Sequence, residues 1–188
     1  ALWKDPNGLT EDERRQELIA IWTDATAELT EAEETGTTFR ENAYIKAKSA
    51  CDETGLPCVA DDSGLSIDYL NGEPGVYSAR YAGEHATDED NNKKLLNALK
   101  DVPADKRTGR YVAELVLAYP DGKELTARGT CEGVIIDEAH GEGGFGYDPY
   151  FYVPSLGHTM AEIPLAEKNA ISHRGLALKK LVALLKDQ

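Results

Sequence analysis

Two strand-forming runs joined by a tight turn constrain the fold of this chain more than any other feature. Residues 110–119 and 124–136 are rich in Val, Ile, Leu, Tyr and Thr, and the residues between them read Pro120-Asp121-Gly122-Lys123. β-Branched and aromatic residues favour strands, whereas Pro, Asp and Gly favour turns. The sequence therefore predicts a long β-hairpin, around which the rest of the chain must build a sheet.

Helix signals stand on both sides of this hairpin. Capping boxes at 10–13 and 38–41 open the first two predicted helices, and Gly55 is suited to end the second. Ser172 is a natural cap for the last helix, whose apolar residues recur at helical spacing. Helices are expected over residues 11–22, from about 39 to Gly55, over Asp88–Leu99, and from Ser172 through Leu178, Leu181, Val182 and Leu185.

The order of these elements predicts an α/β fold with a mixed central sheet flanked by helices and a β-hairpin lobe beside it. A chain of 188 residues fits one domain, here 1–188 with two lobes, and we find no repeat, low-complexity tract or linker.

Charge and cysteine content narrow the class of partner. The formal net charge of −14 argues against a nucleic-acid surface, which needs clustered Lys and Arg, so any nucleotide ligand is expected to be small and metal-bound. The three cysteines lack the paired spacing of a zinc site and are interpreted as reduced thiols, which predicts a cytoplasmic location. No apolar run is long enough to predict a membrane span, and no signal peptide is expected.

Residues 59–64, VADDSG, place two adjacent carboxylates after a short apolar run, interpreted as a buried strand over 56–60 that ends in a Ser-Gly turn. In a parallel α/β sheet, ligands bind where strands end. Mg²⁺ prefers oxygen ligands and often takes one or two carboxylates together with substrate phosphates, a role that Asp61 and Asp62 suit. The alternative is an ordinary polar turn.

A second acidic pair, Glu33 and Glu34, precedes the helix that carries Lys46. One interpretation is that Glu33 or Glu34 shares a metal with Asp62 while Lys46 faces phosphate. The alternative is that the glutamates merely favour a helix N-terminus and that the lysine is solvated.

Glycines alternate with aromatic and acidic residues over 141–149, GEGGFGYDP. The run lacks the Gly-Lys-Ser/Thr ending of a Walker-type loop. Glycines allow a flat ligand to approach the backbone, an aromatic ring can stack on it, and Asp148 can accept hydrogen bonds from a base edge. We prefer this interpretation to that of a glycine-rich connection with its aromatic residues in the core.

The run AEKNAISHRG at 166–175 supplies donors near the start of the last helix, namely Lys168, His173 and Arg174. A pocket that accepts a 6-keto purine and refuses a 6-amino purine needs donors aimed at that atom. The alternative for His173 is a capping or surface role.

Taken together, these segments resemble the inosine triphosphate pyrophosphatase family, also called the non-standard purine nucleotide pyrophosphatases. The resemblance runs from about Glu33 to Leu185 and depends on EETGTTFRENAYIKA, VADDSGLSID, GEPGVYSARYAG, GGFGYDPYF and AEKNAISHRG, in that order. It implies an elongated fold with the active site in a cleft, usually a homodimer. It also implies Mg²⁺-dependent hydrolysis of ITP, dITP and XTP to the monophosphate and pyrophosphate, which clears them from the nucleotide pool.

The resemblance also assigns roles to residues. It implies that Asp62 is the catalytic carboxylate and a metal ligand, with Glu33 or Glu34 as its partner on the metal. It further implies that Ser63 contacts substrate, that Lys46 and Lys168 meet the phosphates and the base region, that Phe145, Gly146, Tyr147 and Asp148 hold the purine, and that His173 and Arg174 read its keto edge.

The chain departs from the family pattern at residues 2–10. The family has an apolar strand and then Thr/Ser-x-Asn-x-x-Lys, whose lysine grips the triphosphate. If Asn7 matches the asparagine, Thr10 stands where the lysine belongs. Either this end is truncated or altered, or part of the phosphate grip is lost. The alternative function is therefore a nucleotide-binding protein with weak or lost turnover.

Overall fold

The computed structural model describes residues 29–186. The chain divides into two units, residues 1–31 and 32–188, and all the elements described below belong to the second. The helix expected over residues 11–22 and the atypical segment around Asn7 and Thr10 lie outside the described residues.

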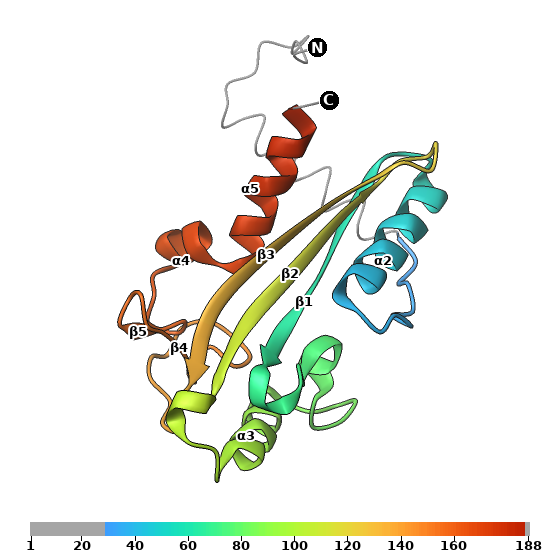
Figure 1. The fold of residues 1–188 in the computed structure, drawn as a ribbon. Coiled ribbons are helices and arrows are strands. Elements are labelled where there is room, and N and C mark those ends of the chain that lie inside the picture. Colours follow the sequence, from blue (N-terminus) through green and yellow to red (C-terminus); the bar gives the residue numbers. More distant parts are fainter. Residues whose placement is uncertain (1–28, 187–188) are drawn as a thin grey trace. The chain divides into compact units, whose positions relative to one another are not determined.

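A twisted antiparallel sheet forms the centre of the second unit (Figure 1). Its strands follow sequence order: β1 (Cys58–Ile67), β2 (Thr108–Ala118), β3 (Glu124–Ile135), β4 (Phe151–Val153) and β5 (His158–Thr159). The predicted hairpin is confirmed as β2 and β3, whose turn closes with a hydrogen bond from the Tyr119 amide to the Lys123 carbonyl, 2.9 Å long. The expected α/β class, a central sheet flanked by helices, is thus confirmed. The expected mixture of parallel and antiparallel strands is not found among the described strands, where every pairing is antiparallel.

Helices and 3₁₀ turns cover this sheet. They are α2 (Phe39–Thr54), η1 (Asp68–Leu70), η2 (Gly75–Arg80), α3 (Asp88–Leu99), η3 (Ala104–Lys106), α4 (Leu165–Ile171) and α5 (His173–Lys186). The expected starts of α2 and α5 are confirmed. Thr38 and Glu41 form a capping box at α2, and the Ser172 hydroxyl accepts from the Gly175 amide at 3.1 Å at α5. The limits of α3 agree with the sequence prediction.

The strand expected over residues 56–60, ending in a turn at the aspartates, is wrong. β1 begins at Cys58 and continues through the aspartates to Ile67, paired residue for residue with β2. Val59, which that prediction made a buried residue, is 46% exposed. The aspartates therefore lie in the middle of a strand that pairs antiparallel, and not at the end of a parallel strand.

Successive side chains of a strand point to opposite faces of the sheet, so each face of β1 and β2 meets a different helix. On one face, Ala43 and Ala47 of α2 pack with Val116 in a small core. On the other, α5 lies so close to β3 that a Cβ on Gly129 would stand 2.0 Å from the His173 carbonyl oxygen. Further along that second face, α3 covers the main core, including Leu65, Leu95, Tyr111 and Phe151.

The apolar stripe expected on α5 is only partly buried. Leu181 is buried, whereas Leu178 is 54% exposed and Val182 and Leu185 are also exposed. The reason is that α5 meets the sheet through small residues, with Ala177 seated at Gly129, so the larger side chains point away from β3. Over residues 29–186, no helix combines the length and the apolar character that crossing a bilayer requires.

Candidate active site

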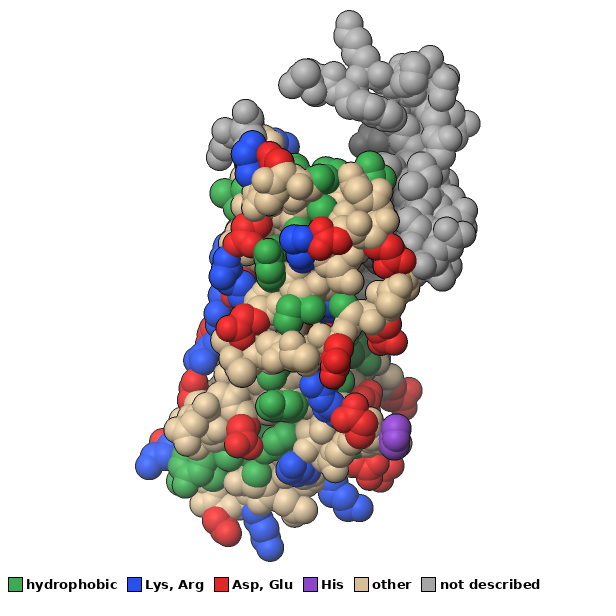
Figure 2. Space-filling model, turned by 90° about the vertical axis from the view of Figure 1, so that its right-hand side faces the viewer, with side chains coloured by type: hydrophobic (Ala, Val, Ile, Leu, Met, Phe, Trp, Pro, Cys, Tyr) green, Lys and Arg blue, Asp and Glu red, His purple; other side chains and the backbone are tan. Residues whose placement is uncertain are grey.

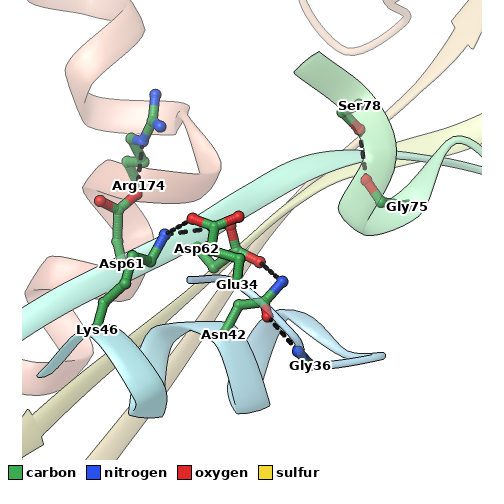
Figure 3. A network of polar contacts seen from close by, with 9 residues as sticks. All are labelled: Glu34, Gly36, Asn42, Lys46, Asp61, Asp62, Gly75, Ser78 and Arg174. Carbon is green, nitrogen blue, oxygen red and sulfur yellow. Dashed lines mark hydrogen bonds and ion pairs between the residues drawn. The ribbon is translucent and has the colours of Figure 1, made fainter. Parts of the chain in front are cut away.

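Asp61 and Asp62 do not share one site. Asp62 faces α2, where its Oδ2 accepts from Asn42 Nδ2 at 3.2 Å. Asp61 faces α5, where its Oδ2 accepts from Arg174 Nε at 2.9 Å (Figure 3). The idea that both carboxylates hold one metal is therefore wrong, because strand alternation sends neighbouring side chains to opposite faces.

Asp62 belongs to a compact polar cluster on the α2 face (Figure 3). The Lys46 ammonium stands between two carboxylates, 2.7 Å from Glu34 Oε1 and 3.4 Å from Asp62 Oδ1. Burial raises the pKa of Asp62 above its ordinary value, while the charge of Lys46 and the hydrogen bond from Asn42 act in the opposite direction. The cluster therefore pairs a buried acid with a cation at hydrogen-bonding range.

Asn42 is a site residue that the sequence did not reveal. Its fully buried side chain donates to Asp62 and accepts from the Gly36 amide at 2.8 Å, so it ties the segment that carries Glu34 to β1. A Cβ on Gly36 would stand 2.6 Å from Asn42 Oδ1, so this approach needs glycine. The only sequence signal for Asn42 was its position beside Ala43, which puts a polar residue on the predicted inner face of the helix.

The structure distinguishes the two glutamates. Glu34 is half-buried and paired with Lys46, whereas Glu33 is exposed. Glu34 is thus the glutamate placed near Asp62. Among residues 29–186, no group of three or more His, Cys, Asp or Glu side chains could hold a metal. On this face, an ion could therefore be bound by two described carboxylates, those of Glu34 and Asp62.

The opposite face of β1 borders a cavity of about 200 Å³. It adjoins a wider hollow of about 1010 Å³ that shares Phe145, Lys168, His173 and Arg174. The smaller cavity is lined by Ser63, Gly64, Leu65, Ser78, Ala79, Asp88, Tyr111, Phe145, Gly146, Tyr147, Asp148, Lys168, His173 and Arg174. The structure thus brings together all the residues expected to contact the substrate, apart from the lysine and acids of the α2 face.

One wall of this cavity is the glycine-rich loop. The buried Asp148 accepts through Oδ2 from the Phe145 amide at 3.0 Å and from Lys168 Nζ at 2.5 Å. The Phe145 ring is 62% exposed, with Lys168 Nζ 5.3 Å and the Arg174 guanidinium carbon 5.9 Å from its centroid. An exposed ring flanked by cations suits a stacked, electron-rich flat ligand.

His173 forms another part of the wall. It is buried and stacks on Tyr111 with ring centroids 4.9 Å apart. Burial, assisted by the charge of Arg174, lowers its pKa from 6.5 to about 4, so the ring is neutral at pH 7. Its buried Nδ1 has no hydrogen-bond partner among the described residues, which leaves a polar atom for a ligand to satisfy.

A close backbone approach shapes the cavity floor. A Cβ on Gly64 would stand 2.3 Å from Ser78 Oγ, and that hydroxyl accepts from the Leu65 amide at 2.8 Å and donates to the Gly75 carbonyl at 2.6 Å. The Tyr147 hydroxyl in turn donates to the Ser78 carbonyl at 2.8 Å. The glycine of the VADDSG run is therefore needed for η2 to dock on β1, and Ser78 was not expected from the sequence.

Comparison with known proteins gives a consistent result. The Ham1 family profile matches residues 9–184. A dITP/XTP pyrophosphatase of Geobacter sulfurreducens is 57% identical over 157 residues, which is 84% of this chain and 77% of that protein. A dITP/XTP pyrophosphatase of Vibrio cholerae is 54% identical over 160 residues, 84% of this chain and 80% of that protein.

Solved structures share the fold. The Ham1 protein of Staphylococcus aureus superimposes with a TM-score of 0.83 at 40% identity, over 95% of this chain and 96% of its own. A HAM1 protein from Coxiella burnetii also gives a TM-score of 0.83, at 42% identity over 96% of each chain.

Proposed function

The chain belongs to the Ham1 family, and from this premise we propose that it hydrolyses deaminated purine nucleoside triphosphates (ITP, dITP and XTP) to the monophosphate and pyrophosphate. The observation that carries the proposal is the position of β1. This strand lies at one edge of the described sheet, with a cavity for a flat ligand on one face and the Asp62–Lys46–Glu34 cluster on the other. A nucleotide whose base fills the cavity reaches the cluster with its phosphates past the strand edge.

Mg²⁺ is the cofactor that fits the α2 face. Asp62 and Glu34 are hard oxygen ligands, and they already hold one cation, the Lys46 ammonium, between them. When bound, Mg²⁺ would polarise a phosphoryl oxygen and neutralise charge on the leaving group. The two carboxylates would hold it, with substrate phosphates and waters completing the shell. Glu33 is exposed and Glu34 is paired with Lys46 beside Asp62, which favours Glu34 as the ligand.

Residues of the chain supply the remaining chemistry. Asp62 accepts a hydrogen bond from the attacking water and orients it toward the α-phosphate. Lys46 stabilises the negative charge that develops on pyrophosphate. Asn42 fixes the carboxylate of Asp62 in position for this task.

Base recognition uses the other face of β1. The ring of Phe145 stacks on the purine, with Gly146 and Tyr147 completing the wall and Ser63 lying on the strand beside it. Lys168, His173 and Arg174 present donors toward a 6-keto oxygen, whereas a 6-amino group finds no matching acceptor in Lys or Arg. Asp148 positions Lys168 and Phe145 through its hydrogen bonds.

The experiment is a product assay. The purified protein is incubated with ITP, dITP, XTP, ATP or GTP and Mg²⁺, and nucleotides and pyrophosphate are separated. We expect pyrophosphate and the monophosphate from the deaminated purines, with ATP, which carries a 6-amino group, cut far more slowly. Release of orthophosphate, or equal rates with ATP and ITP, would contradict the proposal.

A second candidate, a nucleotide-binding protein without turnover, is favoured by one observation in the sequence, Thr10 at the place of the family lysine. Calorimetry separates the two candidates. Binding of ITP with no pyrophosphate released over hours supports the second, whereas turnover eliminates it.

The proposed partner is the purine nucleotide, and the proposed assembly is a homodimer in the cytoplasm. The free thiols of Cys51, Cys58 and Cys131 support a reducing location. Acidic and basic side chains are interspersed over the face drawn in Figure 2, which suits a small ligand better than a nucleic-acid duplex. Light scattering after gel filtration tests the dimer, because a monomeric mass at micromolar concentration would contradict it.

A further inference from the structure

We infer that Asp88 and Asn92 of α3 are positioning residues for base recognition, because together they hold Gly146 and thereby the loop that carries Phe145 and Asp148. The inference rests on the proposed function, in which this loop contacts the purine. Neither residue belongs to the Asp62 cluster on the α2 face, so their role concerns where the loop lies and not the chemistry at the phosphates.

Both polar groups of the Gly146 backbone are bound by α3. Asp88 Oδ2 accepts from the Gly146 amide at 2.7 Å, and Asn92 Nδ2 donates to the Gly146 carbonyl at 2.9 Å. Asp88 and Asn92 are four residues apart on a helix and therefore lie on the same side of it. Gly146 itself has a φ of +62°, a conformation that glycine adopts readily. Two side chains of one helix thus bind both the amide and the carbonyl of a single loop residue.

The two side chains differ in how they are held. Asp88 is the first residue of α3, a position where acidic side chains interact favourably with the helix dipole. Asn92 is 8% exposed, and its buried Oδ1 has no hydrogen-bond partner among the described residues. An unpaired buried acceptor lowers stability, so an apolar residue would suit a purely structural position better. The carboxamide is therefore explained by its bond to Gly146.

The other contacts of the loop lie within it or reach segments other than α3. The Phe145 amide bonds to Asp148 within the loop, and the Tyr147 hydroxyl bonds to the Ser78 carbonyl of η2. Removal of the α3 contacts leaves both of these bonds possible. What is lost is the position of Gly146, the residue directly after the exposed Phe145 ring, at the wall of the 200 Å³ cavity that Asp88 also lines.

The test uses Asn92→Ala and Asp88→Ala in the full chain, with Asp88→Asn as the conservative variant, since an amide oxygen can still accept from Gly146. Matched controls are Asn97→Ala and Glu89→Ala, which remove an amide and a carboxylate from exposed positions of the same helix. Readouts are kcat and KM with ITP and with ATP, Kd for IMP by calorimetry, and the thermal midpoint.

We expect each alanine variant to raise KM for ITP and Kd for IMP by about tenfold, the loss that one hydrogen bond to a charged or buried group typically gives, while kcat stays within about threefold. The preference for ITP over ATP should shrink, Asp88→Asn should recover most of the affinity, and the controls should match wild type.

Unchanged IMP affinity and unchanged ITP preference in both alanine variants would overturn the inference, as would a fall in kcat with KM unaltered. If Asn92→Ala fails to fold, the test depends on Asp88→Ala, which removes the contact with the Gly146 amide by changing an exposed residue. Failure of wild type to bind IMP or to cut ITP would instead count against the proposed function, so the two failures are distinguishable.

Discussion

Asp61 and Asp62 are neighbours in sequence whose carboxylates serve different helices, Asp61 pairing with Arg174 of α5 at 2.9 Å and Asp62 with Asn42 of α2 at 3.2 Å. One strand thereby contributes to both halves of the proposed site, the cavity proposed for the base and the cluster proposed to face the phosphates. Substitutions at adjacent positions should therefore separate binding from chemistry.

Asp62→Asn should lower kcat for ITP by about 100-fold or more, because it neutralises a ligand and hydrogen-bond acceptor while keeping its shape. Asp61→Asn should raise KM by less than about fivefold with kcat nearly unchanged, since its pair with Arg174 is partly exposed. Steady-state kinetics with Mg²⁺ measure both. A wild-type kcat for Asp62→Asn would exclude it as the catalytic carboxylate.

Lys46→Met should shift the acidic limb of the kcat/KM profile to higher pH. The positive charge of Lys46 lowers the pKa of Asp62, so its loss raises that pKa, and the carboxylate is then protonated, and inactive, at a higher pH than in wild type. The matched control is Lys48→Met, which removes an exposed lysine of α2 paired with Asp52. An unmoved limb together with a normal kcat would place Lys46 outside the reaction.

Local signals predicted the elements whose form is decided locally. The hairpin follows from its turn residues, and α2 and α5 from their caps, since these interactions are made within a few residues of sequence. The path of β1 could not be predicted in this way. Asp, Ser and Gly are poor strand formers, and the strand persists because helices on both faces provide partners for Asp61 and Asp62.

Long-range contacts also hid part of the site. In the sequence, Asp88, Asn92 and Asn42 look like ordinary polar residues of helices, and only the approach of the loop or of β1 gives them their contacts with the proposed site. The pairing of Glu34 with Lys46, in preference to Glu33, likewise depends on a backbone path that the sequence does not specify.

Arg174→Ala and His173→Ala should each reduce kcat/KM for ITP by about tenfold or more and leave that for ATP less affected, because a keto oxygen loses a donor that an amino group never used. Lys186→Ala, at the far end of α5, serves as the control. Rates with both substrates give the selectivity. Equal losses of kcat/KM with ITP and ATP would indicate that these residues bind phosphate or have a structural role, and do not recognise the base.

His173 should also make the stability of the protein sensitive to acid. Its pKa is lowered from 6.5 to about 4 by burial, so between these values the unfolded chain binds a proton that the folded chain does not. Stability is therefore fully retained above pH 6.5 and falls as the pH drops toward 4, with a contribution on the order of 3 kcal/mol for a shift of this size.

His173→Gln removes the titration, so the fall in unfolding free energy between pH 7 and 4.5, measured by urea denaturation, should be smaller in the variant than in wild type. The difference between the two proteins cancels the contributions of other groups, such as the opposite one from Asp62, whose raised pKa favours the folded state in acid. His85→Gln, at an exposed histidine, should follow the wild-type curve. Parallel curves for wild type and His173→Gln would show that His173 is accessible to protons in the folded state and that the buried, neutral ring assigned to the base cavity is wrong.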